Sequence, residues 1–352
     1  MTEFLINKQY KQYIKKKRLF IIAITILLFI LFFIGLSAGS IETSVKDILF
    51  SLIGKSDVEN SAIINNIRLP RVLSAILAGI ALAVSGTAMQ SILRNPLASP
   101  VSLGISHGAA FGAAFAIIIL SSAPSGNNTI SATTPYIISL SAFLWSMINT
   151  IIILSIAKLK GAGPETIILS GIISGSLFTA ATSALQYFGD DIQVSSIVFW
   201  MFGDLGKASW NKLWVLLAVT FPATLFFIRN KWNYNALHTG DETAKSLGVK
   251  TEQTRVMGMI VASLASAVTV SFFGIIAFVG LVVPHIVRRF IGTDERFLIP
   301  ASALFGGMFL LLADTIARTI FSPVVLPVGI LTSFLGAPLF IYLLIKNTGR
   351  GM

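Results

Sequence analysis

The sequence predicts an all-α polytopic membrane protein with about ten transmembrane helices. Of its 352 residues, 55% are hydrophobic and 12% are charged, and the mean hydropathy is +0.83. Soluble domains carry about twice that share of charged residues. The apolar residues also fall in runs of about 20, the length that an α-helix needs to cross the hydrocarbon core. Because lipid offers no partner to unpaired backbone groups, these runs are predicted to be helices and not strands.

Ten apolar runs are predicted to span the membrane. The seventh and eighth are the least clearly separated, because only Phe273 and Gly274 mark the break between them. The segment 192–203 is too short to cross a bilayer and is predicted as a short non-spanning helix. The ten predicted spans are 19–40, 69–92, 100–120, 136–157, 166–187, 211–228, 256–273, 275–291, 299–320 and 329–345.

The basic residues predict which side of the membrane each connecting segment faces. Lys and Arg near the ends of spans stay in the cytoplasm, and 19 of the 26 fall on the same side as both termini. We therefore expect a basic cytoplasmic N-terminus at 1–18, a single transmembrane domain at 19–346 with a cytoplasmic loop at 229–255, and a cytoplasmic tail at 347–352. The net charge of +11 then reflects topology and contact with anionic membrane lipid, and nucleic-acid binding is not expected.

Small residues recur every four positions along three of the predicted spans. This spacing lets helix backbones approach closely where lipid supplies no hydrophobic driving force. It predicts a tightly packed bundle and says nothing about a transported molecule. The residues are Ala75, Gly79 and Ala83 in one span, Gly108 and Gly112 in another, and Ala303 and Gly307 in a third.

Two spans resemble each other in a way that predicts an inverted repeat. When Arg71 is aligned with Arg255, several later positions also match, for example Ala78 with Ala262. The first of these spans starts outside the cell and the second starts inside, which is the relation found in transporters with inverted-topology repeats. We therefore expect a translocation pathway between two halves of the chain.

Acidic residues are scarce in the predicted spans. Asp314 is the only one, and Arg318 lies one turn later on the same helix face, which predicts an intrahelical ion pair with a structural role. A transported-ion site is the alternative, but ion-driven carriers bury several ionisable groups. The chain also lacks the G-x-x-x-x-G-K-[ST] motif of phosphate-binding loops. If ATP drives transport, the ATPase is therefore a separate subunit.

Neither an active site nor a metal centre is expected. The chain has no cysteine, and His107 and His285 are lone histidines on different spans without acidic neighbours, which favours packing or hydrogen bonding over metal ligation. Ser106 and His107 are adjacent and so point to different faces of a helix, which argues against a nucleophile and base pair. We predict that the chain is not an enzyme and holds no cofactor.

The segment from Arg229 to Arg255 is a long polar stretch in an otherwise apolar sequence, and it is expected to bind a partner. Thr239 is predicted to cap the amides of a short helix while Glu242 reaches back to the cap. Asp241 favours the positive end of the helix dipole. Gly248 is predicted to end the helix in a left-handed conformation.

An apolar edge is predicted along this short helix, formed by Ala244 and Leu247. A helix of about eight residues is marginal alone in water, so its edge is expected to pack against another surface. A fully solvated surface helix is the alternative.

Motifs along most of the chain resemble those of one family of transport proteins. From about residue 60 to the end, the sequence is similar to the FecCD/BtuC-like permeases of bacterial ABC importers for iron-siderophores, haem and cobalamin. The first span and the N-terminus follow that family only in character. The matching motifs are Arg68-Leu69-Pro70-Arg71, Arg94-Asn95-Pro96-Leu97-Ala98-Ser99-Pro100, Leu103-Gly104, Gly240-Asp241-Glu242, Leu247-Gly248, Phe278-Val279-Gly280-Leu281-Val282-Val283-Pro284-His285, Leu312-Ala313-Asp314, Ala317-Arg318, Leu326-Pro327-Val328-Gly329 and Leu335-Gly336-Ala337-Pro338.

The resemblance implies a permease of ten helices per subunit that works as a dimer, of identical or of related chains. Two cytoplasmic ATPase subunits, which bind ATP and Mg²⁺, would lie below it, and an extracytoplasmic substrate-binding protein above it. One segment would be the coupling helix that seats in a groove of the ATPase. Its residues here are Thr239, Gly240, Asp241, Glu242, Ala244, Leu247 and Gly248.

The resemblance also implies roles at the two ends of the pathway. Arg68, Arg71 and Arg318 match positions where the family presents arginines to acidic residues of the binding protein, and guanidinium groups orient a carboxylate-bearing partner. Anchoring of helix ends at the membrane interface is the alternative for these arginines. Asn95 and Leu97 match a turn that narrows the cytoplasmic end of the pathway, although an Asn-Pro pair by itself indicates only a turn.

The sequence thus predicts the permease subunit of an ATP-driven importer in the plasma membrane of a bacterium. The expected cargo is a ferric siderophore, because such cargo is common in the family, and haem and cobalamin are the alternatives. The alternative from another class is an ion-coupled secondary transporter. That class predicts uptake that depends on an ion gradient and is indifferent to ATP.

Overall fold

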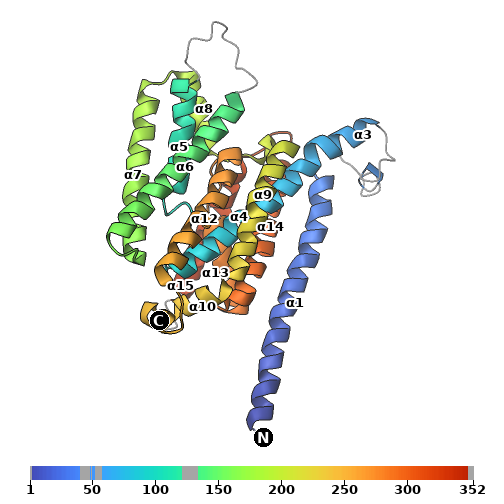
Figure 1. Cartoon of the computed structure of the whole chain (residues 1–352). Coiled ribbons are helices and arrows are strands. Elements are labelled where there is room, and N and C mark those ends of the chain that lie inside the picture. The colour runs from blue at the N-terminus through green and yellow to red at the C-terminus, as the bar shows by residue number, and fades with distance from the viewer. Residues whose placement is uncertain (1, 40–47, 49, 52–57, 121–133, 348–352) are drawn as a thin grey trace.

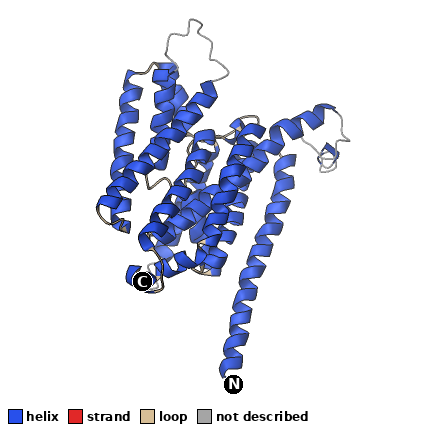
Figure 2. Cartoon of the chain, viewed as in Figure 1, coloured by secondary structure: helices blue, strands red, loops and turns tan. Residues whose placement is uncertain are grey.

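The computed structural model describes residues 2–39, 48, 50–51, 58–120 and 134–347, and within these ranges every regular element is a helix (Figure 2). The predicted tail lies outside the described residues except for Asn347. The elements are α1 (Thr2–Ser37), α3 (Val58–Ile63), η1 (Ile64–Arg68), α4 (Leu69–Ile92), α5 (Ile105–Phe115), η2 (Ala116–Leu120), α6 (Thr134–Leu159), α7 (Pro164–Phe188), α8 (Asp191–Met201), η3 (Leu205–Lys207), α9 (Trp210–Arg229), α10 (Lys231–His238), α11 (Asp241–Ser246), α12 (Thr251–Phe273), α13 (Val279–Ile291), α14 (Glu295–Thr319) and α15 (Val328–Asn347).

The predicted all-α membrane fold is confirmed, and each of the ten predicted spans falls on a helix in the described part of the chain. Seven helices there are long and apolar enough to cross a membrane. Two more spans correspond to shorter apolar helices, one formed by α5 with η2 and the other by α15. The remaining span corresponds to α13, which has 13 residues.

The first helix is longer than predicted. The basic segment 1–18 and the span 19–40 were expected as separate parts, but α1 runs without a break through both. Lys17 connects the basic part of α1 to the bundle. Its side chain is 2% exposed, its ammonium lies 3.9 Å from the Asp294 carboxylate, and it also lies over the rings of Tyr13 and Phe297.

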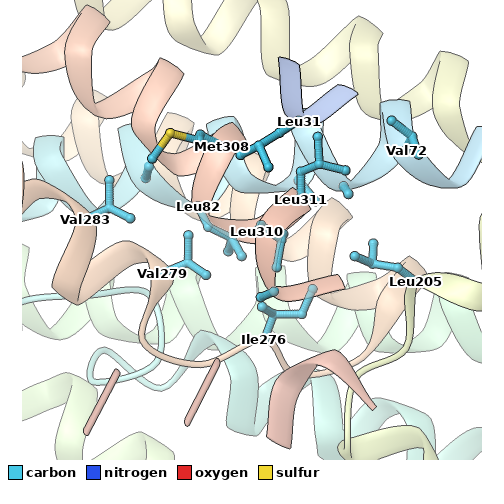
Figure 3. Close-up of a cluster of buried hydrophobic side chains, with 14 of the residues drawn as sticks. Leu31, Val72, Leu82, Leu205, Ile276, Val279, Val283, Met308, Leu310 and Leu311 are labelled. Carbon is cyan, nitrogen blue, oxygen red and sulfur yellow. The ribbon is translucent and has the colours of Figure 1, made fainter. Parts of the chain in front are cut away.

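The helix α4 lies at the centre of the bundle. In its apolar stretch 78% of the residues are buried, against 17% for α1 at the edge (Figure 1). Helices α9, α12, α13 and α14 pack around it. Figure 3 shows Val72 and Leu82 of α4 in one apolar cluster with Leu31 of α1, Val283 of α13 and Leu311 of α14.

The predicted small-residue stripes are contact surfaces between helices. A Cβ atom built on Gly79 of α4 would lie 2.9 Å from the Cα of Gly307 and would also meet the carbonyl of Gly306 on α14. The same holds between α5 and α6, where a Cβ on Gly112 would lie 2.5 Å from the Ser141 carbonyl oxygen. These helices approach so closely because no side chain separates their backbones.

We expect Gly79→Ala to destabilise the protein by about 1–3 kcal/mol, because the added methyl group would force the α4 and α14 backbones apart. Thermal unfolding in detergent, followed by tryptophan fluorescence, measures the effect. Gly163→Ala is the matched control, since its nearest neighbouring atom lies 4.0 Å from the added Cβ and its φ is −65°. Equal unfolding temperatures for the two variants would contradict the close packing.

The two spans that were aligned as an inverted repeat lie antiparallel. Arg255, at the start of α12, donates a hydrogen bond of 3.0 Å to the carbonyl of Ile92, at the end of α4. The two helices therefore enter the membrane from opposite sides, as the alignment requires, while the repeat itself stays a prediction. The start of α1 and the end of α15 lie toward the end of the bundle that carries α10 (Figure 1), in agreement with a common cytoplasmic side.

Three element boundaries sharpen or correct the predictions. The span predicted at 275–291 begins only at Val279, because Gly274, with a φ of +78°, ends α12 and the next residues are not helical. The span predicted at 100–120 begins only at Ile105, after a turn that ends at Gly104 with a φ of +79°. The short helix expected at 192–203 is confirmed as α8.

Candidate functional site

The polar segment after Arg229 folds into two short helices, α10 and α11, and not into one. The predicted left-handed stop is confirmed, because Gly248 has a φ of +85°. The Val249 amide donates to the Ala244 carbonyl and the Gly248 amide to the Lys245 carbonyl, the pair of bonds that closes a Schellman motif. The helix before this stop spans Asp241–Ser246.

The predicted capping box at the start of this helix is wrong. The Thr239 hydroxyl donates a 2.8 Å hydrogen bond to the Ala236 carbonyl and so closes the end of α10. Gly240 is the N-cap of α11, with a φ of +105° and no side-chain cap bond. The cause is helix α10, which was not predicted. It ends at His238, so Thr239 is the C-cap of α10 and not the N-cap of α11.

The predicted apolar edge of α11 is divided between two environments. Ala244 is fully buried against the bundle, whereas Leu247 is 66% exposed. Glu242 is exposed as well. The helix is therefore fixed to its own chain by Ala244 and presents Leu247 and Glu242 outward, where a partner can reach them.

Asp241 joins this helix to the transmembrane bundle, in an arrangement that we call the Asp241 clamp. Its carboxylate accepts a hydrogen bond from the Arg255 guanidinium and lies 3.3 Å from the guanidinium of Arg94. Arg255 is 2% exposed and also donates to the Ile92 carbonyl at the end of α4. The hydrogen bond from Arg255 is the main reason that the pKa of Asp241 lies below its ordinary value, so the clamp stays ionised at neutral pH.

The turn after α4 contains the two residues predicted as a cytoplasmic gate. The Asn95 side-chain oxygen accepts a 2.8 Å hydrogen bond from the Leu97 amide, which fixes the turn, and the Leu97 side chain is 48% exposed. The turn borders a groove of about 530 Å³ whose other wall begins at Gly163. Arg94, the first residue of the turn, belongs to the Asp241 clamp. Gating by Asn95 and Leu97 stays a prediction.

A second polar network holds α10 against the bundle, and the sequence reasoning missed it. Glu295 is fully buried and accepts a 2.5 Å hydrogen bond from the Ser91 hydroxyl of α4. The same carboxylate lies 3.0 Å from the His238 ring nitrogen, and the Asn235 side chain accepts from the Glu295 amide. Burial, together with the Glu295 charge, raises the pKa of Tyr234.

Glu295 is thus a second fully buried acid on the helix that carries Asp314, although it lies outside the predicted span 299–320. The apolar helix α14 begins at Glu295, four residues before the predicted span, because the Asp294 carboxylate caps it by accepting from the Arg296 amide. The sequence Asp294-Glu295 ahead of an apolar run was the available signal for this earlier start. The partners of Glu295 on α10 and α4 are too distant in the sequence to be predicted from it.

At the opposite end of the bundle, Asp314 lies between two arginines. Its carboxylate is fully buried and accepts hydrogen bonds of 2.8 and 3.1 Å from Arg71. On the other side the Arg318 guanidinium lies 3.0 Å away, so the predicted intrahelical pair is confirmed. Pairing with Arg71, 243 positions away, was not predicted.

Arg68 and Arg318 also hold the end of α1. Arg68 donates to the carbonyls of Leu36 and Ser37, and Arg318 donates to those of Gly35 and Ala38, at distances of 2.8–3.0 Å. These are carbonyls that a helix end leaves without partners. These bonds hold the end of α1 against the bundle, while anchoring at the membrane interface, the alternative for these arginines, stays a prediction.

The three arginines are largely buried in the described part of the chain. Arg68 and Arg318 are 5% and 7% exposed, and the Arg71 side chain is 13% exposed. An exposed position at the outer surface is thus not found, because Asp314 and the end of α1 draw the guanidinium groups into the protein. Contact with a binding protein stays a prediction.

Comparisons with known proteins agree with this architecture. The FecCD transport family matches residues 27–346. MJ0087 from Methanocaldococcus jannaschii, provisionally described as an ABC transporter permease, is 53% identical over 98% of this chain and 99% of its own length. The hemin transport permease HmuU from Yersinia pestis is 37% identical over 80% of this chain and 83% of its own length.

A solved structure, described as an inward-facing conformation of a provisionally assigned metal-chelate type ABC transporter, is similar in fold. Its TM-score is 0.82, with 32% identity, and the match covers 93% of this chain and 98% of that one. Further relatives are named for the import of vitamin B12, iron(3+)-citrate and iron(3+)-hydroxamate. The family match covers most of the chain, and this protein belongs to the FecCD transport family of ABC importer permeases.

Proposed function

We propose that this permease moves a ferric siderophore, delivered by a substrate-binding protein, across the membrane at the expense of ATP bound with Mg²⁺ on separate ATPase subunits. It would act with a second permease subunit. The observation that carries the mechanism is the Asp241 clamp, which connects an exposed cytoplasmic helix to the end of the central helix α4. Haem and cobalamin are the alternative cargoes, since relatives are named for each.

The clamp supports a coupling role for α11. A movement of α11 acts on Asp241, then on Arg255 and the last carbonyl of α4, and through Arg94 on the turn that contains Asn95. Charge-assisted hydrogen bonds of this kind are strong and directional, so they transmit a displacement better than apolar contacts do. Closure of the ATPases would in this way reach the cytoplasmic end of the pathway.

The outward face of α11 supports contact with an ATPase. Leu247 and Glu242 are exposed there, and a groove of about 690 Å³, lined in part by Lys245 and Lys250, runs beside the helix. An exposed apolar side chain next to a polar rim is typical of the centre of a protein interface. We therefore assign Leu247 as the apolar anchor and Glu242 as a polar contact.

At the outer end, the buried arginines support electrostatic attraction of the binding protein. Arg68, Arg71 and Arg318 carry three positive charges against one negative charge on Asp314, which leaves a surplus of two. Such a surplus accelerates the approach of a partner that bears carboxylates. It acts at a distance and does not require that the guanidinium groups be exposed.

Leu247→Asp is expected to weaken association with the cognate ATPase about tenfold or more, because a desolvated apolar anchor is replaced by a charge. Leu159→Asp is the matched control, since Leu159 is 85% exposed at the same end of the bundle but lies outside the 229–255 loop. Co-purification of the two subunits from membranes measures association. Equal association of both variants would contradict the role of α11.

Reconstitution tests the proposed function as a whole. The permease is placed in liposomes with its cognate ATPase and binding protein, and ferric siderophores, haem and cobalamin are compared for uptake with and without ATP. The expected result is ATP-dependent uptake of a ferric siderophore. ATP-dependent uptake of haem or cobalamin alone would overturn the cargo, and uptake driven by an ion gradient without ATP would overturn the mechanism.

A further inference from the structure

A cavity of about 570 Å³ lies near the end of the bundle opposite to α10. Its lining comes from the start of α6, from α8, from η3 and the start of α9, and from the end of α12. The lining of the cavity includes no residue of the Asp241 clamp, none of the ion pairs of Asp314 and none of the turn that contains Asn95. It is therefore a feature of the molecule that the transport mechanism does not explain.

The walls of this cavity are mostly apolar, and the charged side chains in its lining are both positive. Ile138, Trp200 and Phe272 contribute apolar surface, and Trp200 is 7% exposed. Among the described residues, the charged side chains in the lining are Lys207 and Lys212, and no acid lines the cavity. An apolar space with two ammonium groups at one side matches a ligand that has an anionic end and a hydrocarbon part.

The two lysines are held in place by the fold. The Lys212 ammonium donates a 2.8 Å hydrogen bond to the Lys207 carbonyl, so the two side chains belong to one local structure. Among the described residues, the Lys207 ammonium has no ion pair within 4.0 Å. Burial lowers the pKa of Lys207, and the Asp204 charge offsets this only in part. A bound anion would relieve the cost of keeping this charge in an apolar setting.

The position of the cavity points to lipid. Trp210 and Trp214, in the first turns of α9, stack on each other, and Trp214 is 60% exposed. Exposed tryptophans near a span end mark the level of the lipid head groups. The flanking helices α6 and α9 also expose apolar side chains such as Leu140 and Val215, which hydrocarbon chains would contact.

We propose that this cavity binds a phospholipid with an anionic head group, with the phosphate near Lys207 and Lys212 and an acyl chain against Trp200 and Phe272. A free phosphate would use only the lysines and leave the apolar walls in contact with water. A zwitterionic lipid would bring its own cation to a site that already has two. The proposal does not depend on which cargo the permease carries.

Native mass spectrometry of the delipidated full-length protein in detergent tests the proposal. Phosphatidylglycerol, phosphatidylcholine and soluble glycerol 3-phosphate are each titrated. We expect phosphatidylglycerol to bind about tenfold more tightly than phosphatidylcholine, and the double variant K207Q/K212Q to lose this preference. Lys160→Gln, which removes one positive charge at an exposed position in the turn after α6, is expected to retain it.

A second variant tests the apolar part with both lysines intact. Ser196→Trp places a large ring in the cavity lining from an exposed position on α8, and it is expected to reduce phosphatidylglycerol binding without affecting the fold. Equal binding of the two lipids by the wild-type protein would overturn the proposal, as would unchanged selectivity in the double variant. Binding of glycerol 3-phosphate as tight as that of the lipid would assign the site to a soluble phosphate instead.

Discussion

Replacing Asp314 with asparagine is expected to destabilise the protein by about 3–5 kcal/mol, because the change leaves two buried guanidinium groups without their counter-ion. Asp314 is fully buried, and it is the acceptor for every hydrogen bond that Arg71 donates among the described residues. Asparagine has nearly the same shape, so the cost comes from charge and not from a cavity. Thermal unfolding in detergent measures the loss.

A double-mutant cycle separates this effect from general damage. Arg71→Met is expected to be costly in the wild-type protein but nearly neutral, or stabilising, in the Asp314→Asn background, where Arg71 is already unpaired. Asp190→Asn serves as the control for the same chemical change. Asp190 is an exposed N-cap of α8, and asparagine caps a helix about as well. Additive effects of the Asp314 and Arg71 changes would contradict the buried ion pair.

Replacing Arg255 with alanine is expected to reduce ATP-driven uptake by about thirtyfold or more. Truncation of a buried, hydrogen-bonded charge costs about 2–5 kcal/mol, and each 1.36 kcal/mol in a barrier is a factor of about ten in rate. The change removes both the bond to Asp241 and the bond to the Ile92 carbonyl. Because Leu247 and Glu242 are untouched, association with the ATPase is expected to persist while uptake is lost.

The comparison of association with uptake distinguishes uncoupling from unfolding. Arg289→Ala is the matched control, since Arg289 is an exposed arginine on α13 that belongs to neither polar network. Arg255→Lys is expected to restore little, because a single ammonium group cannot serve the carboxylate and the carbonyl in the geometry of a guanidinium fork. Wild-type uptake by the alanine variant would show that the clamp does not transmit movement.

Predictions from the sequence were correct where the structure depends on residues that are close together in the chain. Gly248 ends α11 in a left-handed conformation as predicted, because only glycine adopts that conformation without strain. The stripe through Gly79 packs closely against another helix as predicted, and the structure shows that this helix is α14. The prediction of a capping box at Thr239 was wrong for a similarly local reason. The Thr239 hydroxyl bonds instead to a carbonyl of α10, the helix directly before it, which was not predicted.

The polar networks needed the tertiary structure. Arg71 meets Asp314 and Ser91 meets Glu295 across more than 200 positions, and no spacing rule reaches that far. The burial of Arg68, Arg71 and Arg318 follows from contacts of the same long range, with Asp314 and with the end of α1.

By itself, the sequence determined the membrane environment, the helical fold with the approximate positions of its spans and, through its motifs, the family. Hydrophobic length, basic-residue placement and small-residue spacing act within one helix or at its ends, so they can be read along the chain. Only the tertiary structure decided that Asp241 clamps α11 to α4 and that Asp314 forms ion pairs with two arginines. Those pairings depend on which distant helices the packed bundle brings together, because a buried charge takes the partner that the fold places beside it.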